Sequence, residues 1–220
     1  MADQNEKPLI LIPARRDSKG VPFKNRRLLD YTLGTIPPEW RRQVVISTND
    51  EAIIEEVGKR YASCRIHHRS NSSALDTATT KECVEEVIRD LSITGPVVML
   101  YLTYPQREWH QVMDAWAWYQ ERPEKSLLCR EEVELHPYLC LYEQPNCRGS
   151  QVVKHDLCRR QDYPTVFKLC HMISIFDSEE LENLNNNLYN DDTIYYKIPR
   201  AIDIDTTADL KKFHEEEYNG

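Results

Sequence analysis

The stretch Leu9-Ile-Leu-Ile12 is a four-residue aliphatic run, followed closely by Arg15-Arg-Asp-Ser-Lys-Gly-Val-Pro-Phe-Lys-Asn-Arg-Arg27. Continuous aliphatic runs are typical of strands that are buried on both faces of a sheet. A polar segment directly after such a strand lies at its carboxyl end, which is where ligands bind in open α/β folds. These two segments therefore favour an α/β fold with a binding site beside the first strand.

Strand-like and helix-like segments alternate through the first half of the chain. Gln43–Ser47 is a second apolar run, and Val97–Leu102 is a third. Between them, Thr79-x-x-Glu82 has the spacing of a capping box at the start of a helix, and Trp109–Glu121 has helical spacing. This alternation predicts a Rossmann-like, mostly parallel sheet with helices on both faces.

The second half of the chain departs from this pattern. Residues 126–168 contain short β-like pieces interrupted by prolines, which predicts a β-arm that leaves the sheet. Such an arm is either a surface loop or an element that reaches a partner subunit. Strand-like segments resume at Leu169–Phe176 and Ile194–Ile198. A length of 220 residues fits one domain, residues 1–220, with this elaboration.

Composition excludes several classes of protein. The chain has 28 basic and 36 acidic residues and a net charge of −8, which argues against general binding to nucleic acid or to a membrane surface. No apolar run approaches the ~20 residues that span a bilayer. The first eight residues, MADQNEKP, have no basic or apolar region of a secretory signal. Seven cysteines without a Cys-x-x-Cys pair indicate reduced thiols, and we expect a cytoplasmic protein.

The basic loop, residues 15–27, is the first candidate site. It has six basic residues and one acidic residue, in a chain that is acidic overall. Lysine and arginine at the end of a parallel strand suit a polyphosphate, and Gly20 would allow backbone N–H groups to approach phosphate oxygens. The alternative is a solvated surface loop. The loop matches neither the P-loop nor the dinucleotide-binding glycine pattern.

Asp203-Ile-Asp205 is the second candidate. In an extended segment, residues i and i+2 point to the same side, so both carboxylates converge while Ile204 turns inward. Two carboxylates, together with phosphate oxygens and water, are typical ligands of Mg²⁺. The alternative is an acidic strand end that caps the following helix.

Five segments, in order along the chain, resemble the acylneuraminate (CMP-sialic acid) cytidylyltransferase family. They are Ile12-Pro-Ala-Arg-Arg-Asp-Ser-Lys-Gly-Val-Pro-Phe-Lys-Asn25, Val45–Thr48, the block from Arg69 to Asp76-Thr-Ala-Thr-Thr80, Arg160-Gln-Asp-Tyr-Pro164, and Ala201–Leu210. The resemblance covers essentially the whole chain, and the first and last segments are the specific ones. It implies a homodimer whose arm reaches toward the partner's site. It also implies transfer of CMP from CTP to a nine-carbon keto-sugar acid, with release of pyrophosphate.

The resemblance also assigns roles to individual residues. Those matching CTP contacts or falling at the cytidine are Arg15, Ser18, Lys19, Lys24, Asn25, Arg69 and Thr80. Those matching a magnesium pair are Asp203 and Asp205, and those expected at the sugar are Tyr101, Arg160 and Gln161. Within these sets, the residues that the resemblance makes catalytic are Arg15, Lys19, Lys24 and Asp205.

The chain departs from the family at the sugar side. Tyr101 stands where the family usually has glutamine, and Cys170–Ser174 replaces an Asn-Gly-Ala-Ile-Tyr-like strand. Three hypotheses follow for the function: activation of a sialic-acid-like sugar, activation of another ulosonic acid, or CTP binding without catalysis.

Overall fold

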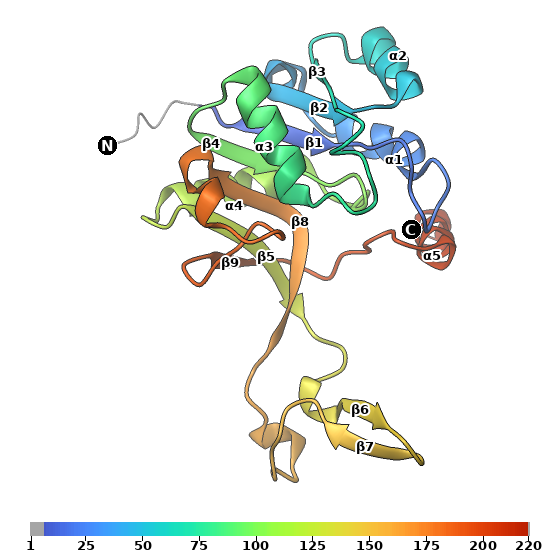
Figure 1. Cartoon of the computed structure of the whole chain (residues 1–220), viewed down its shortest axis with the longest axis vertical. Helices are drawn as coiled ribbons and strands as arrows, with labels where there is room; N and C mark the ends of the chain where they lie inside the picture. The colour runs from blue at the N-terminus through green and yellow to red at the C-terminus, as the bar shows by residue number, and fades with distance from the viewer. Residues whose placement is uncertain (1–6, 220) are drawn as a thin grey trace.

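The computed structural model describes residues 7–219, and Figure 1 shows a layered α/β body from which a long arm extends. Residues 1–6, which carry most of the segment where no secretory signal is expected, lie outside the described residues. The elements of the first half are β1 (Leu9–Pro13), α1 (Lys24–Leu33), η1 (Pro38–Gln43), β2 (Val44–Thr48), α2 (Glu51–Arg60), β3 (Arg65–His68), α3 (Thr80–Leu91), β4 (Pro96–Met99) and α4 (Trp109–Gln120). Those of the second half are β5 (Ser126–Glu132), η2 (Pro137–Leu139), β6 (Leu141–Gln144), β7 (Arg148–Gln151), η3 (Arg160–Asp162), β8 (Phe167–Asp177), η4 (Ser178–Asn183), β9 (Ile194–Lys197) and α5 (Thr207–Asn219).

The central sheet has seven strands in the order β3-β2-β1-β4-β8-β5-β9. Strand β1 lies parallel to β2 and β4, with Ile10 opposite Val44 on one side and Val98 on the other. Strand β8 is antiparallel to both of its neighbours, β4 and β5, whereas β9 is parallel to β5. The predicted mostly parallel, Rossmann-like sheet is therefore confirmed.

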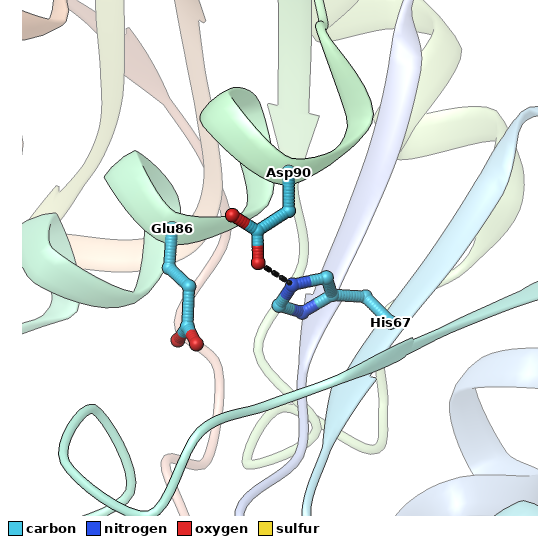
Figure 2. Close-up of side chains that lie close together, drawn as sticks. All are labelled: His67, Glu86 and Asp90. Carbon is cyan, nitrogen blue, oxygen red and sulfur yellow. Dashed lines mark hydrogen bonds and ion pairs between the residues drawn. The ribbon is translucent and has the colours of Figure 1, made fainter.

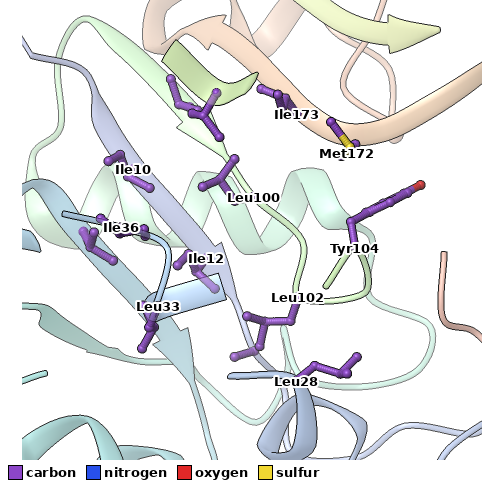
Figure 3. Packing of buried hydrophobic residues seen from close by; sticks show 14 of the residues in the cluster. Ile10, Ile12, Leu28, Leu33, Ile36, Leu100, Leu102, Tyr104, Met172 and Ile173 are labelled. Atoms are coloured by element: carbon purple, nitrogen blue, oxygen red, sulfur yellow. The ribbon is translucent and has the colours of Figure 1, made fainter. Parts of the chain in front are cut away.

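Both faces of the sheet are buried, which explains the continuous aliphatic run in β1. Ile10 and Ile12 pack on one face against Leu28 and Leu33 of α1 (Figure 3). Leu11 points to the opposite face, where it joins a separate cluster with residues of α3. Because neither face of β1 contacts solvent, apolar and polar residues need not alternate along the strand.

Side-chain caps are present at the starts of α2 and α3, and the sequence predicts the one at α3. The capping box of Thr79 and Glu82 is present at the start of α3, and the Asp50 side chain caps α2. Helix α1 was not predicted, since its first residues belong to the basic loop. It begins after Phe23, a non-glycine residue with a left-handed backbone (φ 54°).

The arm is present, but its boundaries differ from the predicted 126–168. Residues 126–132 form β5, a strand of the central sheet between β8 and β9, and β8 begins already at Phe167. The sequence prediction places β5 in the arm because it is one of several short β-like pieces in a segment that prolines interrupt. The arm proper follows β5 and carries the hairpin of β6 and β7, whose residues are all exposed (Figure 1).

Within residues 7–219, no helix has the length and apolar character that a membrane crossing requires. All seven cysteines are free, and Cys64, Cys83, Cys129 and Cys170 are buried.

Candidate active site

A cavity of about 330 Å³ lies beyond the carboxyl ends of β1 and β4, beside the first turn of α3. This is the place where ligands bind in open parallel sheets. The predicted site residues in its wall are Arg15, Ser18, Lys24, Asn25, Arg69, Thr80, Tyr101, Asp203 and Asp205. The fold therefore brings together residues from both ends of the chain.

The basic loop meets the α3 entry segment through Asp76. Arg15 Nη1 lies 2.7 Å from Asp76 Oδ1, and Lys19 Nζ lies 3.1 Å from Asp76 Oδ2. These two cations lower the pKa of Asp76, with the hydrogen bond from Lys19 as the largest contribution. Lys19 itself is 77% exposed and is absent from the cavity wall, so it lies at the rim next to Asp76.

Lys24 connects the basic loop to the C-terminal aspartate segment. Its side chain is 11% exposed, and Nζ donates to Ile204 O at 2.7 Å and to Asp205 Oδ1 at 2.9 Å. Asn25 Nδ2 donates to Arg15 O at 2.7 Å and so holds the backbone of the loop. The first turn of α1 thus holds both the aspartate segment and the start of the basic loop in place.

Close packing requires glycine at position 20, and the sequence alone does not indicate this requirement. A Cβ atom at this position would lie 1.8 Å from the backbone oxygen of Asp205, a separation that no side chain permits. The glycine therefore lets the basic loop pack directly on the aspartate segment. Its predicted role toward phosphate stays a prediction.

Asp203 is a partly buried carboxylate with one unsatisfied oxygen. Tyr104 OH donates to Oδ2 at 2.9 Å, whereas Oδ1 is buried and has no hydrogen-bond partner. Burial raises the pKa of Asp203, and the charge of Asp205 raises it further. Ile204 is fully buried between the two, as the i, i+2 spacing predicts.

The aspartate pair fits a divalent cation. Asp205 is 69% exposed and Asp203 presents a buried oxygen without a partner, so both carboxylates reach the cavity wall. Hard cations such as Mg²⁺ take carboxylate oxygens as ligands and keep several waters. A cation at this place would satisfy the oxygen that the protein leaves unpaired.

Another part of the cavity wall is aromatic and includes Tyr101, the residue expected at the sugar. Tyr101 OH is 2.8 Å from Thr80 Oγ1, and its ring meets the His171 ring edge-on with centroids 5.9 Å apart. Burial raises the pKa of Tyr101 to about 12, so the phenol stays protonated at neutral pH. Burial also lowers the pKa of His171, whose Nδ1 is buried without a partner.

Sequence reasoning assigned no role to Tyr104 or His171, although both line the cavity. His171 enters the wall because β8 runs antiparallel beside β4, a pairing that no local pattern indicates. Tyr104 is 99 positions from the aspartate that it contacts.

Arg160 and Gln161 lie elsewhere. They form the exposed turn η3 on the arm and are absent from the cavity wall of their own chain. The structure therefore does not bring these two predicted sugar contacts to the site within one chain.

The fold defines a class, since solved cytidylyltransferases share it. The solved structure of a CMP:2-keto-3-deoxy-manno-octonic acid synthetase complexed with CTP superimposes with a TM-score of 0.69. The two sequences are 13% identical, and the match covers 97% of this chain and 99% of that one. This likeness shows the fold.

Comparison of sequences gives relatives with higher identity than this structural neighbour. The chain is 26% identical over 217 residues to the N-acylneuraminate cytidylyltransferase of Streptococcus agalactiae serotype V, covering 93% of this chain and 52% of that protein. It is 26% identical over 221 residues to the pseudaminic acid cytidylyltransferase of Campylobacter jejuni, covering 93% and 94%. The chain thus spans about half the length of the Streptococcus relatives. No protein-family model matches it. The resemblance found in the sequence is confirmed.

Proposed function

We propose that this protein transfers CMP from CTP to a keto-sugar acid and releases pyrophosphate. The observation that carries the proposal is the junction of the basic loop with the aspartate pair, through Lys24 and Gly20, around one cavity. Phosphoryl and nucleotidyl transfer depend mainly on positioning and charge neutralisation. A cavity with cations on one wall and two carboxylates on another suits that chemistry.

In this proposal, Arg15, Lys19 and Lys24 bind the triphosphate and stabilise the charge that develops on the leaving pyrophosphate. Asp76 holds Arg15 and Lys19 at the cavity mouth until phosphate replaces it as their partner. Asp203 and Asp205 would hold Mg²⁺, which when bound neutralises phosphate oxygens and fixes their geometry.

Two groups of the cavity wall can accept the proton that the acceptor hydroxyl loses. Asp205 has one oxygen bound to Lys24 and a second one free of that contact. Burial lowers the pKa of His171, so its imidazole is neutral at neutral pH and has a nitrogen lone pair that can accept a proton. Both lie in the wall of the cavity.

For the acceptor, we favour a nine-carbon sialic-acid-like sugar. The names of the curated relatives, acylneuraminate and pseudaminic acid cytidylyltransferase, support this choice. The fold neighbour that acts on an eight-carbon acid supports the alternative of another ulosonic acid. Tyr101 at the sugar side gives the specific reason to keep the third hypothesis, a CTP-binding protein without catalysis.

We also infer a homodimer, with the arm of one copy completing the site of the other. Arg160 and Gln161 are on the arm and away from their own cavity, which supports their action across the dimer. Exposed apolar side chains on the arm, including Leu135 at 59% and Leu141 at 65%, provide a contact surface. Seven free cysteines support a reducing, cytoplasmic environment.

The decisive experiment measures pyrophosphate release from MgCTP with a panel of eight- and nine-carbon keto-sugar acids, with UTP as the nucleotide control. Release with CTP and one acceptor establishes the activity and identifies the sugar. Measurable CTP binding without release on any acceptor supports the non-catalytic hypothesis. Absence of both would contradict the proposal.

A further inference from the structure

A second cluster of ligand-type side chains lies between β3 and α3, next to Cys83 of the cavity wall, because Ser47 Oγ contacts both His67 Nδ1 and Cys83 Sγ. His67 comes from β3, and Glu86 and Asp90 come from successive turns of α3, as Figure 2 shows. One ligand atom from each residue lies within 4.8 Å of the others. His67 is 4% and Glu86 is 7% exposed, whereas the Asp90 side chain is 41% exposed. The cluster is therefore mostly buried and open on one side.

The cluster has two carboxylates and one imidazole, and among the described residues Arg89 contributes a cation, with its Nε 3.0 Å from Asp90 Oδ1. In the described part of the chain, no lysine or arginine forms an ion pair with Glu86. Two carboxylates four residues apart on a helix repel each other unless a cation lies between them.

The distances match metal coordination better than a direct ion pair. His67 Nε2 and Asp90 Oδ2 are 3.3 Å apart, which is long for a charge-assisted hydrogen bond. Two ligand atoms of a tetrahedral zinc site, each about 2.1 Å from the metal, are separated by about 3.4 Å. Glu86 places a carboxylate oxygen within 4.8 Å of the other two ligand atoms, and its carboxylate would turn toward them to become the third ligand.

The surrounding residues also hold each ligand in place. Ser47, which lies opposite His67 in the β2–β3 register, has its Oγ 3.0 Å from His67 Nδ1. This contact fixes the ring and leaves Nε2 toward the carboxylates. The backbone N–H of Ser70 donates to Glu86 Oε1 at 2.9 Å, and the Ser73 hydroxyl donates to Oε2. Hydrogen bonds that orient the ligands are a general property of metal sites.

We propose that His67, Glu86 and Asp90 bind a divalent first-row transition metal, Zn²⁺ by preference, at a site separate from the aspartate pair of the cavity. One imidazole and two carboxylates suit zinc, and water completes the coordination on the exposed side. The ion balances the two carboxylates and ties α3 to the edge strand β3. Because α3 also carries Thr80 and Cys83 of the cavity wall, the metal stabilises the position of that wall.

The test is calorimetric titration of the whole protein with Zn²⁺ in the absence of Mg²⁺ and CTP. We expect one tight site in the wild type and at least tenfold weaker binding in Glu86→Gln and Asp90→Asn. His68→Ala is the matched control, since His68 is the next residue of the same strand and is exposed. It should bind zinc within twofold of the wild type.

A second readout separates the cluster from adventitious binding by surface histidines. Co²⁺ substituted for Zn²⁺ should give visible ligand-field bands in the wild type and in His68→Ala, and weak ones in Asp90→Asn. Asp90 is partly exposed, so its isosteric substitution leaves the fold intact, which circular dichroism checks. A wild type that binds no zinc at micromolar concentration would overturn the proposal. Equal binding in the wild type, Glu86→Gln and Asp90→Asn would also overturn it.

Discussion

Asp203 is held in an environment that opposes its own charge. Its raised pKa, caused mainly by burial, means that the ionised form destabilises the folded state above the unfolded pKa near 3.8. We expect Asp203→Asn, without divalent cations, to raise the melting temperature by a few degrees at pH 7. The gain should vanish as the pH falls below about 4, where the wild-type carboxyl is protonated in both states. Thermal denaturation from pH 3 to pH 8 measures this.

The same substitution should lower turnover with MgCTP by about 10²-fold or more, since one of two carboxylates at the proposed cation is lost. If Asp203→Asn is more stable and less active than the wild type, its loss of activity is not caused by unfolding. Unchanged turnover would remove Asp203 from the site.

Lys24 and Lys19 belong to the same loop but differ in burial. Lys24→Met removes two hydrogen bonds from a nearly buried ammonium group, which should lower the free energy of unfolding by about 1–3 kcal/mol. It should also lower kcat/KM for CTP at least tenfold.

Lys19→Ala changes an exposed side chain, so we expect weaker CTP binding at unchanged stability. Urea denaturation and steady-state kinetics on both variants distinguish these roles, and equal stability losses would contradict them.

At the scale of elements, the contact between the basic loop and the aspartate segment depends on one missing methyl group. Gly20→Ala places a Cβ against the Asp205 backbone, and we expect a loss of about 1–3 kcal/mol in stability together with loss of CTP binding. Gly58→Ala is the control, because Gly58 lies inside α2 and has open space around its Cβ position. That change should stabilise the protein by about 0.5–1 kcal/mol. Chemical denaturation of the two variants compares them, and similar effects would contradict the packing argument.

The elements that the sequence predicts well are those defined by local chemistry. Leu9–Ile12 is recognisable as a strand because both faces are apolar, and Thr79 with Glu82 marks a helix start because each side chain satisfies the other's backbone. Helix α1 was missed because Arg26 and Arg27 indicate charge and not helical periodicity. In the structure, Arg26 pairs with Asp50, the cap of α2, at 2.6 Å.

The parts that escaped prediction depend on pairing between distant segments. Strand β5 enters the sheet between β8 and β9, although its charged end is typical of a surface piece. His171 reaches the cavity only through the antiparallel register of β8. The candidate site was predicted from residue types at its two ends, whereas its aromatic wall required the topology.

At the scale of the whole molecule, the arm extends away from the α/β body of its own chain, as Figure 1 shows. We expect a dimer of twice 25.9 kDa in solution, and Leu141→Glu should shift it toward monomer, because a charge would be buried at the contact. Tyr218→Glu is the control, since Tyr218 is 93% exposed on α5 and away from the arm. Sedimentation equilibrium of both variants tests this, and a monomeric wild type would contradict the dimer.

The hydrogen bond from Lys24 to Ile204 joins residues that are 180 positions apart. On the ribosome, the sheet strands through β8 emerge long before Asp203 and Asp205, so the nascent chain can form most of its core while the site is still half built. A product terminated shortly after β9 would retain all the strands and lack both carboxylates. Such a chain would also lack the buried Ile204 and Phe213, so we expect it to be less stable as well as unable to bind. The complete site can therefore form only after residue 205 has been synthesised.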